Sequence, residues 1–398
     1  MKELLSAKKI KIIFILAFMS SLAPLSTDMY LPALSEVQIA FHTNPFYMQL
    51  SIVSFFLAFS LGQLIYGPIS DVYGRKIPLY VGLIIFIVST FACLSVDSIY
   101  AFIVFRFLQA LGGCAGVVIT RAIVNDNFSF KEASSIFALI MVTSSLAPML
   151  SPTFGSLLLD YFSWKSIFTT LFILGIILLL CVIFGLKDIK EKRNNLKLDT
   201  KHVLKNYITI LKDRRFRIYI FSSAFAMATI FAYIAGSSYI FREYYGLSEK
   251  AYGILFGLNA FSFIIFANIN AQITLKYSYS PYSILPKAFF IMFIIALLLI
   301  CVGIFRLHFV FFEILLFFMI GMLGFVAPNT TTLAMARFKN NSGSASALFG
   351  TTQFLIAGFV AFIVSVIEAN SPLPLAFVIA MCLIVASSIY FFIIPRRR

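Results

Sequence analysis

The sequence predicts an all-helical membrane protein with twelve transmembrane helices in two bundles of six. Three observations predict this fold class. The chain has 398 residues, of which 61% are hydrophobic and 12% are charged, whereas soluble domains carry about 25% charged residues. The hydrophobic residues form continuous runs of the length that crosses a bilayer, about 20 residues. One long basic segment separates the first six runs from the last six.

The apolar runs are continuous and do not alternate in polarity. In lipid, a single segment satisfies its own backbone polar groups only as a helix, so each run is expected to be helical. The predicted spans are Ile12–Leu34, Phe46–Ile69, Pro78–Val96, Ile99–Thr120, Ala133–Leu159, Ser166–Leu186, Ile218–Tyr239, Ala251–Ile273, Ser283–Phe305, Phe309–Met335, Ser344–Ile367 and Pro374–Ile394.

The longest polar segment covers residues 187–217 and is rich in Lys and Arg. A charged run between spans is usually a solvated linker that also contacts anionic lipid headgroups. The expected organisation is therefore an N-terminal six-helix bundle at residues 1–186, a cytoplasmic basic linker at 187–217 and a C-terminal six-helix bundle at 218–398.

The Lys and Arg residues also predict the orientation, because cytoplasmic loops carry an excess of them. Most of the 31 lie in the N-terminal segment, the central linker, the C-terminus and alternate loops. The opposite side holds only Lys165, Arg242, Lys250 and Arg306. We therefore expect a multi-pass protein with both termini in the cytoplasm.

Several function classes are disfavoured by the composition. The net charge of +15 could indicate a nucleic-acid partner, but no basic face repeats along any helix, so none is expected. Five Cys and three His are scattered along the chain, which predicts neither a disulfide framework nor a metal site, and no cofactor is expected. No catalytic motif of a hydrolase, metalloprotease or phosphate-binding enzyme appears, so the protein is not expected to be an enzyme.

Asp28 lies inside the first apolar run, and a carboxylate at that depth costs about 2.5 to 3.5 kcal/mol on insertion scales. The one other charge that lies as deep is Arg106, in the fourth span, at about the same distance from the outer surface. An intramembrane ionisable residue indicates function by default. We expect Asp28 and Arg106 to couple proton movement to transport. The alternative is a static ion pair that fixes the helices together.

Other polar side chains could line a cavity between the spans. Gln109 follows Arg106 by three residues and shares its helix face, while most intramembrane Asn and Gln join helices through hydrogen bonds. Glu313 is expected to extend to the membrane surface, with a second proton site as the alternative. The candidate substrate-binding residues are Asp28, Tyr30, Gln109, Tyr233, Asn259 and Gln353.

Two segments contain residues that predict turns or bends. In the loop after the second span, Gly74 permits a tight turn, and Asp71 is expected to meet a helix N-terminus or a basic side chain. Two prolines four residues apart predict a bend in the fifth span. The candidate structural or gating residues are Gly67, Asp71, Gly74, Arg75, Lys76, Pro148, Pro152 and Gly155.

These segments resemble a known family. Residues 67–76 resemble the G-x-x-x-D-x-x-G-R-K signature of the major facilitator superfamily, with Val72 where the family usually has Arg. Residues 106–113 resemble its fourth-span signature, R-x-x-Q-x-x-G-G, and residues 147–155 resemble its antiporter signature in part. The run Ser-Thr-Asp-Met-Tyr-Leu-Pro-Ala-Leu at 26–34 is similar to that of the bicyclomycin-resistance (Bcr/CflA) group of drug:proton antiporters.

The resemblance implies a proton-coupled secondary active exporter of small, largely apolar compounds that works by alternating access. It implies that Asp28 carries the proton and that Arg106 is its coupling partner. The alternative is a proton-coupled importer (symporter) or a uniporter of a small metabolite with the same fold. The implied location is the bacterial inner (plasma) membrane, and the expected partners are a small-molecule substrate, protons and the lipid bilayer. The protein is expected to be a monomer.

Overall fold

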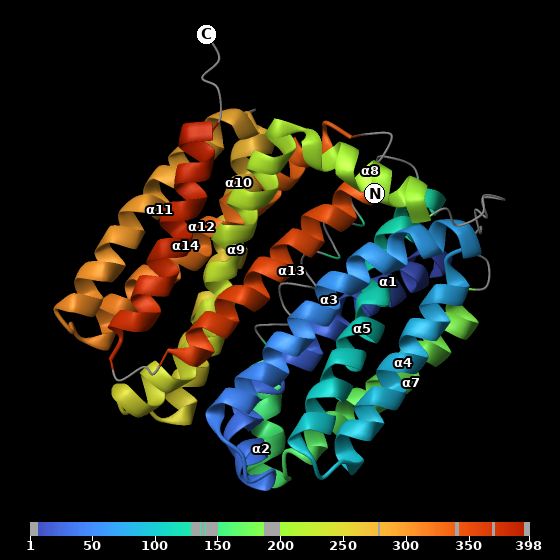
Figure 1. Ribbon diagram of the computed structural model, residues 1–398, viewed down its shortest axis with the longest axis horizontal. Helices are drawn as coiled ribbons and strands as arrows, with labels where there is room; N and C mark the ends of the chain where they lie inside the picture. Colours follow the sequence, from blue (N-terminus) through green and yellow to red (C-terminus); the bar gives the residue numbers. More distant parts are fainter. Residues whose placement is uncertain are drawn as a thin grey trace. The chain divides into compact units, whose positions relative to one another are not determined.

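The computed structural model describes residues 7–128, 136, 140, 150–186, 200–277, 279–338, 342–367 and 371–393. Within these ranges the chain forms helices and no strand (Figure 1). Eleven helical segments of the described residues are long and apolar enough to cross a membrane. The prediction of an all-helical membrane protein is confirmed. The predicted fifth span, Ala133–Leu159, lies mostly outside the described residues, although residues 150–161 are helical.

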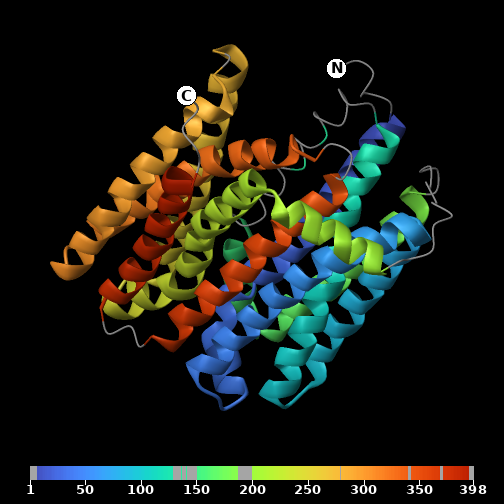
Figure 2. The same ribbon diagram turned by 45° about the horizontal axis from the view of Figure 1, so that its top comes forward.

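The chain divides into two compact units, Met1–Val203 and Leu204–Arg398. In the first unit, α5 packs against α3 and α4, and α1 packs against both α5 and α7. These helices run alongside one another in both views (Figures 1 and 2). The elements of this unit are α1 (Ala7–Asp28), η2 (Leu31–Ala33), α2 (Leu34–Ala40), α3 (Pro45–Tyr73), α4 (Lys76–Ser95), α5 (Ile99–Asn127) and α7 (Lys165–Gly185).

The first apolar segment is longer than predicted, and it is interrupted. The predicted span Ile12–Leu34 was expected to be one helix, whereas α1 ends at Asp28 and the chain continues through a turn, the 3₁₀ helix η2 and α2. Pro32, within η2, has no N–H to donate to a helical ladder. As a result, Asp28 lies at a helix end within an apolar segment that extends from Ile10 to Ala40.

The helix at residues 150–161 packs closely against this interruption. A Cβ atom on Gly155 would lie 2.4 Å from the carbonyl oxygen of Met29 and 2.9 Å from Cγ of Pro32. Carbon and oxygen atoms cannot approach so closely without displacement, so only glycine fits at position 155 as the backbone stands.

In the second unit, α12 packs against α9, α10 and α11, and α9 also packs against α13 and α14 (Figure 1). A π-helical segment, η3 (Tyr239–Tyr244), continues α9. The other elements are α9 (Arg214–Ser238), α10 (Glu249–Lys276), α11 (Pro281–Ile304), α12 (Phe309–Met335), α13 (Ser342–Val366) and α14 (Leu373–Ile393).

Part of the segment that was expected to be a solvated linker is helical. Residues Thr200–Lys212 form α8, in which Tyr207 and Ile210 are buried. Asn206 Nδ2 donates a hydrogen bond to Ser344 Oγ at 3.1 Å. In addition, α9 begins at Arg214, four residues before the predicted start of the second bundle. The rest of the predicted linker, residues 187–199, lies outside the described residues.

Asp213 caps the N-terminus of α9 and binds Arg337. Its Oδ1 accepts hydrogen bonds from the Phe216 N–H at 2.7 Å and from Arg337 Nε at 2.8 Å. Arg337 Nη2 donates to Oδ2 at 2.5 Å, which makes the ion pair bidentate. Partial burial raises the pKa of Asp213, but the hydrogen bonds from Arg337 and Phe216 outweigh burial and hold that pKa below its ordinary value.

Candidate functional site

Asp28 is the last residue of α1 and is buried, with 5% of its surface exposed. Its carboxylate forms no hydrogen bond and no ion pair with any described residue. The C-terminal end of a helix carries partial negative charge, which is unfavourable for an anion. A buried carboxylate without a partner is costly. The position therefore suits a group that binds a proton or a cation.

Arg106 of α5 is completely buried and reaches the last turn of α1. Its Nη1 donates one hydrogen bond to the carbonyl oxygen of Ser26 at 3.1 Å and another to Gln109 Oε1 at 2.6 Å. Gln109 Nε2 in turn donates to Thr90 Oγ1 at 2.8 Å, on α4. Gln109 is thus fixed between Arg106 and α4 and is fully buried.

Aromatic rings surround the guanidinium group of Arg106. Its central carbon lies 4.7 Å from the ring centroid of Tyr30, 4.6 Å from that of Phe55 and 5.7 Å from that of Phe168. Each ring presents a π face that attracts a cation at these distances. The remaining nitrogens, Nε and Nη2, are buried and have no hydrogen-bond partner. Arg106 therefore keeps two unused donors in this conformation.

The structure brings Arg106 to the turn that carries Asp28, but no ion pair joins the two residues within the described chain. Tyr30, predicted to bind substrate, is fully buried; its hydroxyl forms a hydrogen bond of 3.0 Å with Ser51 Oγ. In this conformation Tyr30 is a wall of the aromatic cage around Arg106.

The turn between α3 and α4 contains a network of charges. Arg75 Nη1 donates to Asp71 Oδ1 at 2.6 Å and to Ser70 Oγ at 2.7 Å, and Arg75 Nε donates to Asp126 Oδ2 at 2.8 Å. Burial lowers the pKa of Arg75, but its hydrogen bonds to the two carboxylates outweigh burial and raise it. Asp71 thus meets a basic side chain, one of the two partners that the sequence suggested. Asp126, at the end of α5, is a partner that the sequence analysis missed.

The other predicted structural residues have different surroundings. Gly74 follows α3 with φ of 84°, a conformation that favours glycine, and Lys76 begins α4. In contrast, a Cβ atom on Gly67 would meet nothing within 4 Å. Pro152 is buried in the 150–161 helix. Pro148, and with it the bend predicted between the two prolines, lies outside the described residues.

The predicted polar residues of the second unit fall into two groups. In the first group, Asn259 Nδ2 of α10 donates to the hydroxyl of Tyr233 of α9 at 3.1 Å. In the second, Gln353 Nε2 of α13 donates to Ser223 Oγ at 3.3 Å, and Thr330 Oγ1 donates to the same Ser223 Oγ at 3.1 Å. Both groups join neighbouring helices.

Glu313 belongs to the first of these groups. This residue was predicted to extend to the membrane surface, but it is buried in the structure, with 6% exposed. It lies near enough to Asn259, Tyr233 and Tyr252 to interact with them electrostatically. The expectation failed because a position near the end of a span does not indicate which way a side chain faces.

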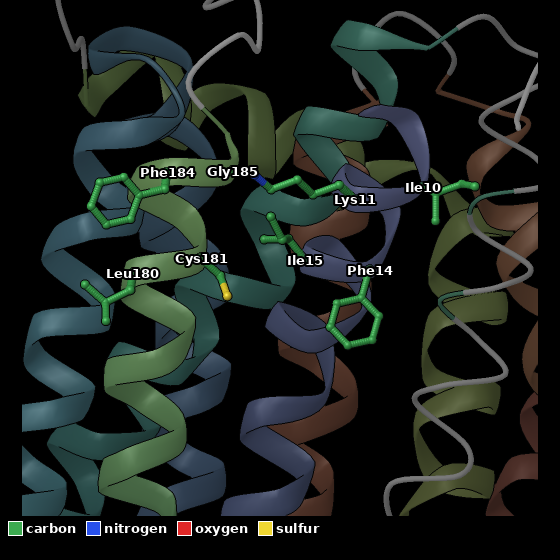
Figure 3. A pocket seen from close by; sticks show the side chains of 8 residues that line it. All are labelled: Ile10, Lys11, Phe14, Ile15, Leu180, Cys181, Phe184 and Gly185. Carbon is green, nitrogen blue, oxygen red and sulfur yellow. The ribbon is translucent and has the colours of Figure 1, made fainter. Parts of the chain in front are cut away.

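An apolar groove of about 650 Å³ lies between α1 and α7 (Figure 3). None of the predicted site residues lines it. Phe14 precedes Asp28 by fourteen residues, about 21 Å along a helix. The groove is therefore separate from the Asp28 region. It is lined by Ile10, Lys11, Phe14, Ile15, Leu180, Cys181, Phe184 and Gly185.

Residues 16–362 match the family model of the Major Facilitator Superfamily. The chain belongs to the major facilitator superfamily. It is therefore a multi-pass membrane transporter of small molecules and not an enzyme.

Two relatives in this superfamily match almost the whole chain. The uncharacterized MFS-type transporter YdgK of Bacillus subtilis (strain 168) is 30% identical over 98% of this chain and 97% of its own length. A bicyclomycin resistance protein homolog of Haemophilus influenzae is 26% identical over 99% of each chain. The multidrug transporter MdfA of Yersinia pestis is 28% identical over 58% of this chain and 57% of its own length.

Solved structures of major facilitator transporters share the fold. The human organic anion transporter MFSD10 superposes with a TM-score of 0.70 at 14% identity, covering 97% of this chain and all of that one. A D-xylose-proton symporter superposes with a TM-score of 0.70 at 13% identity, covering 98% of this chain and 97% of that one.

Proposed function

We propose that this transporter exports small, largely apolar compounds by alternating access in exchange for protons. The observation that carries the proposal is Asp28, a buried carboxylate at a helix end with no partner among the described residues. Such a group gains much from a proton or a cationic substrate and little from remaining ionised. The names of two relatives, a bicyclomycin resistance protein homolog and a multidrug transporter, support export of drug-like compounds.

In this mechanism, Asp28 binds a proton when it is open to the outside and releases the proton when it is open to the cytoplasm. Proton and substrate compete for the same region, so proton binding promotes substrate release. Each proton driven inward by a potential of 100 mV supplies about 2.3 kcal/mol.

Arg106 acts as a coupling partner in this scheme. It holds the end of α1 through the Ser26 carbonyl oxygen, and its two free nitrogens are available to bind a carboxylate in another conformation. Gln109 positions Arg106. We further propose that Tyr30, Gln109, Tyr233, Asn259 and Gln353 contact substrate during the cycle, since alternating access changes which side chains are exposed.

Everted membrane vesicles energised by respiration test the proposal. Addition of bicyclomycin or an apolar antibiotic to vesicles with the wild-type protein is expected to dissipate the internal acid pH, because substrate enters as protons leave. Asp28→Asn is expected to abolish this response while the protein remains folded, and Asp28→Glu is expected to retain part of it. Asp97→Asn, an exposed acid at another position, serves as the control. A pH response of wild-type size in Asp28→Asn vesicles would refute the proposal.

The alternative function is import of a metabolite together with protons, or without them. Right-side-out vesicles with an imposed inward proton gradient distinguish these directions. Antiport predicts substrate extrusion under that gradient, whereas symport predicts substrate uptake, and a uniporter would not respond to it.

We also propose the arrangement of the chain in the bacterial inner membrane, with both termini in the cytoplasm and a monomeric functional unit. The concentration of Lys and Arg on one side of the predicted spans supports this orientation. The two compact units support two helical bundles with the basic segment at residues 187–217 between them. Labelling of single cysteines by an impermeant reagent would test the orientation of each loop.

A further inference from the structure

A second buried carboxylate, Glu313 of α12, lies among polar side chains of the second unit. Both of its carboxylate oxygens are buried and form no hydrogen bond. The Oδ1 atom of Asn259 on α10 is also buried without a hydrogen-bond partner. The two residues lie close enough to interact. None of these three buried oxygen atoms therefore receives a hydrogen bond.

The polar side chains nearby form hydrogen bonds with one another and none with Glu313. Asn259 Nδ2 donates to the Tyr233 hydroxyl at 3.1 Å, and the hydroxyl of Tyr252 forms a hydrogen bond of 2.9 Å with Ser237 Oγ. The ring of Tyr233 stacks on that of Phe256, with centroids 5.5 Å apart, which fixes its position. The amide nitrogen of Asn259 is therefore committed to Tyr233, and Asn259 Oδ1 remains an unpartnered acceptor.

No cation compensates the carboxylate within the described residues. The titratable groups that face Glu313 are Tyr233 from α9 and Tyr252 from α10. Arg242 of η3 interacts with Tyr252 and forms no ion pair with Glu313. Helices α11 and α13 present no described charged side chain to Glu313. An ionised carboxylate in this position would carry a desolvation cost without a partner to offset it.

One proton on Glu313 resolves these unsatisfied groups. A neutral carboxyl group has one O–H donor, and Asn259 Oδ1 is the unpartnered acceptor beside it. A hydrogen bond between them satisfies both groups and removes the buried charge. A rotated Asn259 would direct its nitrogen to Glu313 and its oxygen to the Tyr233 hydroxyl, but one neutral amide donor would still leave the buried negative charge without a cation.

We propose that Glu313 is a second proton-binding site, with its protonated carboxyl group held by Asn259. That this proton exchanges during transport rests on the proposed function; the proton site itself does not. If both acids exchange protons, one cycle can move a proton through each unit.

Infrared difference spectroscopy of the purified protein in lipid nanodiscs tests the site. At about pH 7, exposed Glu residues are ionised because their ordinary pKa is about 4.3. A protonated carboxylic acid is therefore identified by its C=O stretch. To separate the two acids, the measurement compares Asp28→Asn with the double variant Asp28→Asn/Glu313→Gln. The band is expected in the first and absent from the second. Glu243→Gln in the Asp28→Asn background, which changes an exposed acid, is the matched control and should keep the band.

A further variant covers the case in which Glu313→Gln does not fold. Asn259→Leu in the Asp28→Asn background leaves Glu313 in place and removes its acceptor, so the C=O band is expected to shift or to disappear. Equal band intensity in Asp28→Asn and Asp28→Asn/Glu313→Gln, with both proteins folded, would overturn the proposal, as would an unchanged band in the Asn259→Leu variant. The readout requires no transport. A vesicle experiment without proton coupling would therefore refute the proposed function and leave the Glu313 site standing.

Discussion

Arg106 Nη1 donates a hydrogen bond of 3.1 Å to the carbonyl oxygen of Ser26, whereas Asp28, two residues further on, has no described partner. The guanidinium thus holds the end of α1 through its backbone and leaves the acid free. A direct ion pair would hold Asp28 in its charged form. In the observed arrangement the cation can position the acid without neutralising it.

Substitutions of Arg106 should distinguish this role from simple packing. Arg106→Ala removes the bonds to Ser26 and Gln109 and empties the aromatic cage, so we expect no substrate efflux and a loss of stability of about 1–3 kcal/mol. Arg106→Lys keeps the charge but lacks the planar fork, so partial efflux is expected. Efflux from everted vesicles and thermal unfolding in detergent provide the two measurements. Equal efflux by wild type, Arg106→Ala and Arg106→Lys would show that the residue only fills space.

Because the backbone at Gly155 lies close to Met29, any side chain added at position 155 is expected to lower the stability of the protein. Gly155→Ala places a Cβ atom 2.4 Å from a carbonyl oxygen, so the backbone must shift; we expect a loss of about 1–3 kcal/mol. Gly67→Ala is the matched control, because it adds the same atom in a helix where nothing lies within 4 Å. That control should be neutral or slightly stabilising, as Ala favours helices over Gly. Similar melting temperatures for the two variants would contradict this packing.

The charge network at the α3–α4 turn predicts that Asp126 stabilises the folded protein. Asp126→Asn removes the charge that faces Arg75 Nε, a side chain that is only 9% exposed. We expect the free energy of unfolding to fall by about 1–3 kcal/mol, because the buried Arg75 cation loses one of its two negative partners. Thermal unfolding with Asp97→Asn as the exposed control measures this. The prediction fails if both substitutions leave the melting temperature unchanged.

Asp213 and Arg337 predict a dependence of stability on pH. The pKa of Asp213 is below its ordinary value of 3.8 in the folded protein. The stabilisation of the folded protein by the ionised Asp213 is therefore fully present above about pH 5. It is lost as the pH falls through 3.8 towards the pKa of Asp213 in the folded protein. Because Arg337 is 35% exposed, the pair is expected to contribute only about 0.5–1 kcal/mol.

Arg337→Gln tests this pair. The variant should be less stable than the wild type at about pH 7, and the difference should shrink as the pH falls below about 4. Arg217→Gln, at an exposed position of the same helix end as Asp213, is the control and should match the wild type. A difference that stays constant over this pH range would show that the ion pair does not cause it.

The eleven candidate spans of the described chain follow from the lengths of the apolar runs, which is why the fold class was predictable. The environments of individual side chains were harder to predict. The cage around Arg106 combines Tyr30 from the turn after α1, Phe55 from α3 and Phe168 from α7, and spacing within one helix cannot identify such partners. The same reason explains why Asp126 was missed and why Glu313 was placed at the surface.

The end of α1 at Asp28 was also not predicted. The hydrophobic run continues without interruption to Leu34, and hydropathy does not distinguish a straight helix from a helix, a turn and a 3₁₀ helix. Pro32 was a signal that could have been used, because a proline breaks the hydrogen-bond ladder of the residues before it. Helix α8 was missed for a similar reason, because its apolar residues are interspersed with basic ones and the whole segment 187–217 is basic.

The contact between Gly155 and the Met29 carbonyl oxygen leaves no clearance for independent sliding. A displacement of the acid-bearing segment toward the 150–161 helix therefore requires that helix to move as well. Protonation of Asp28 that shifts this segment would in this way act directly on a second span, through backbone contact alone.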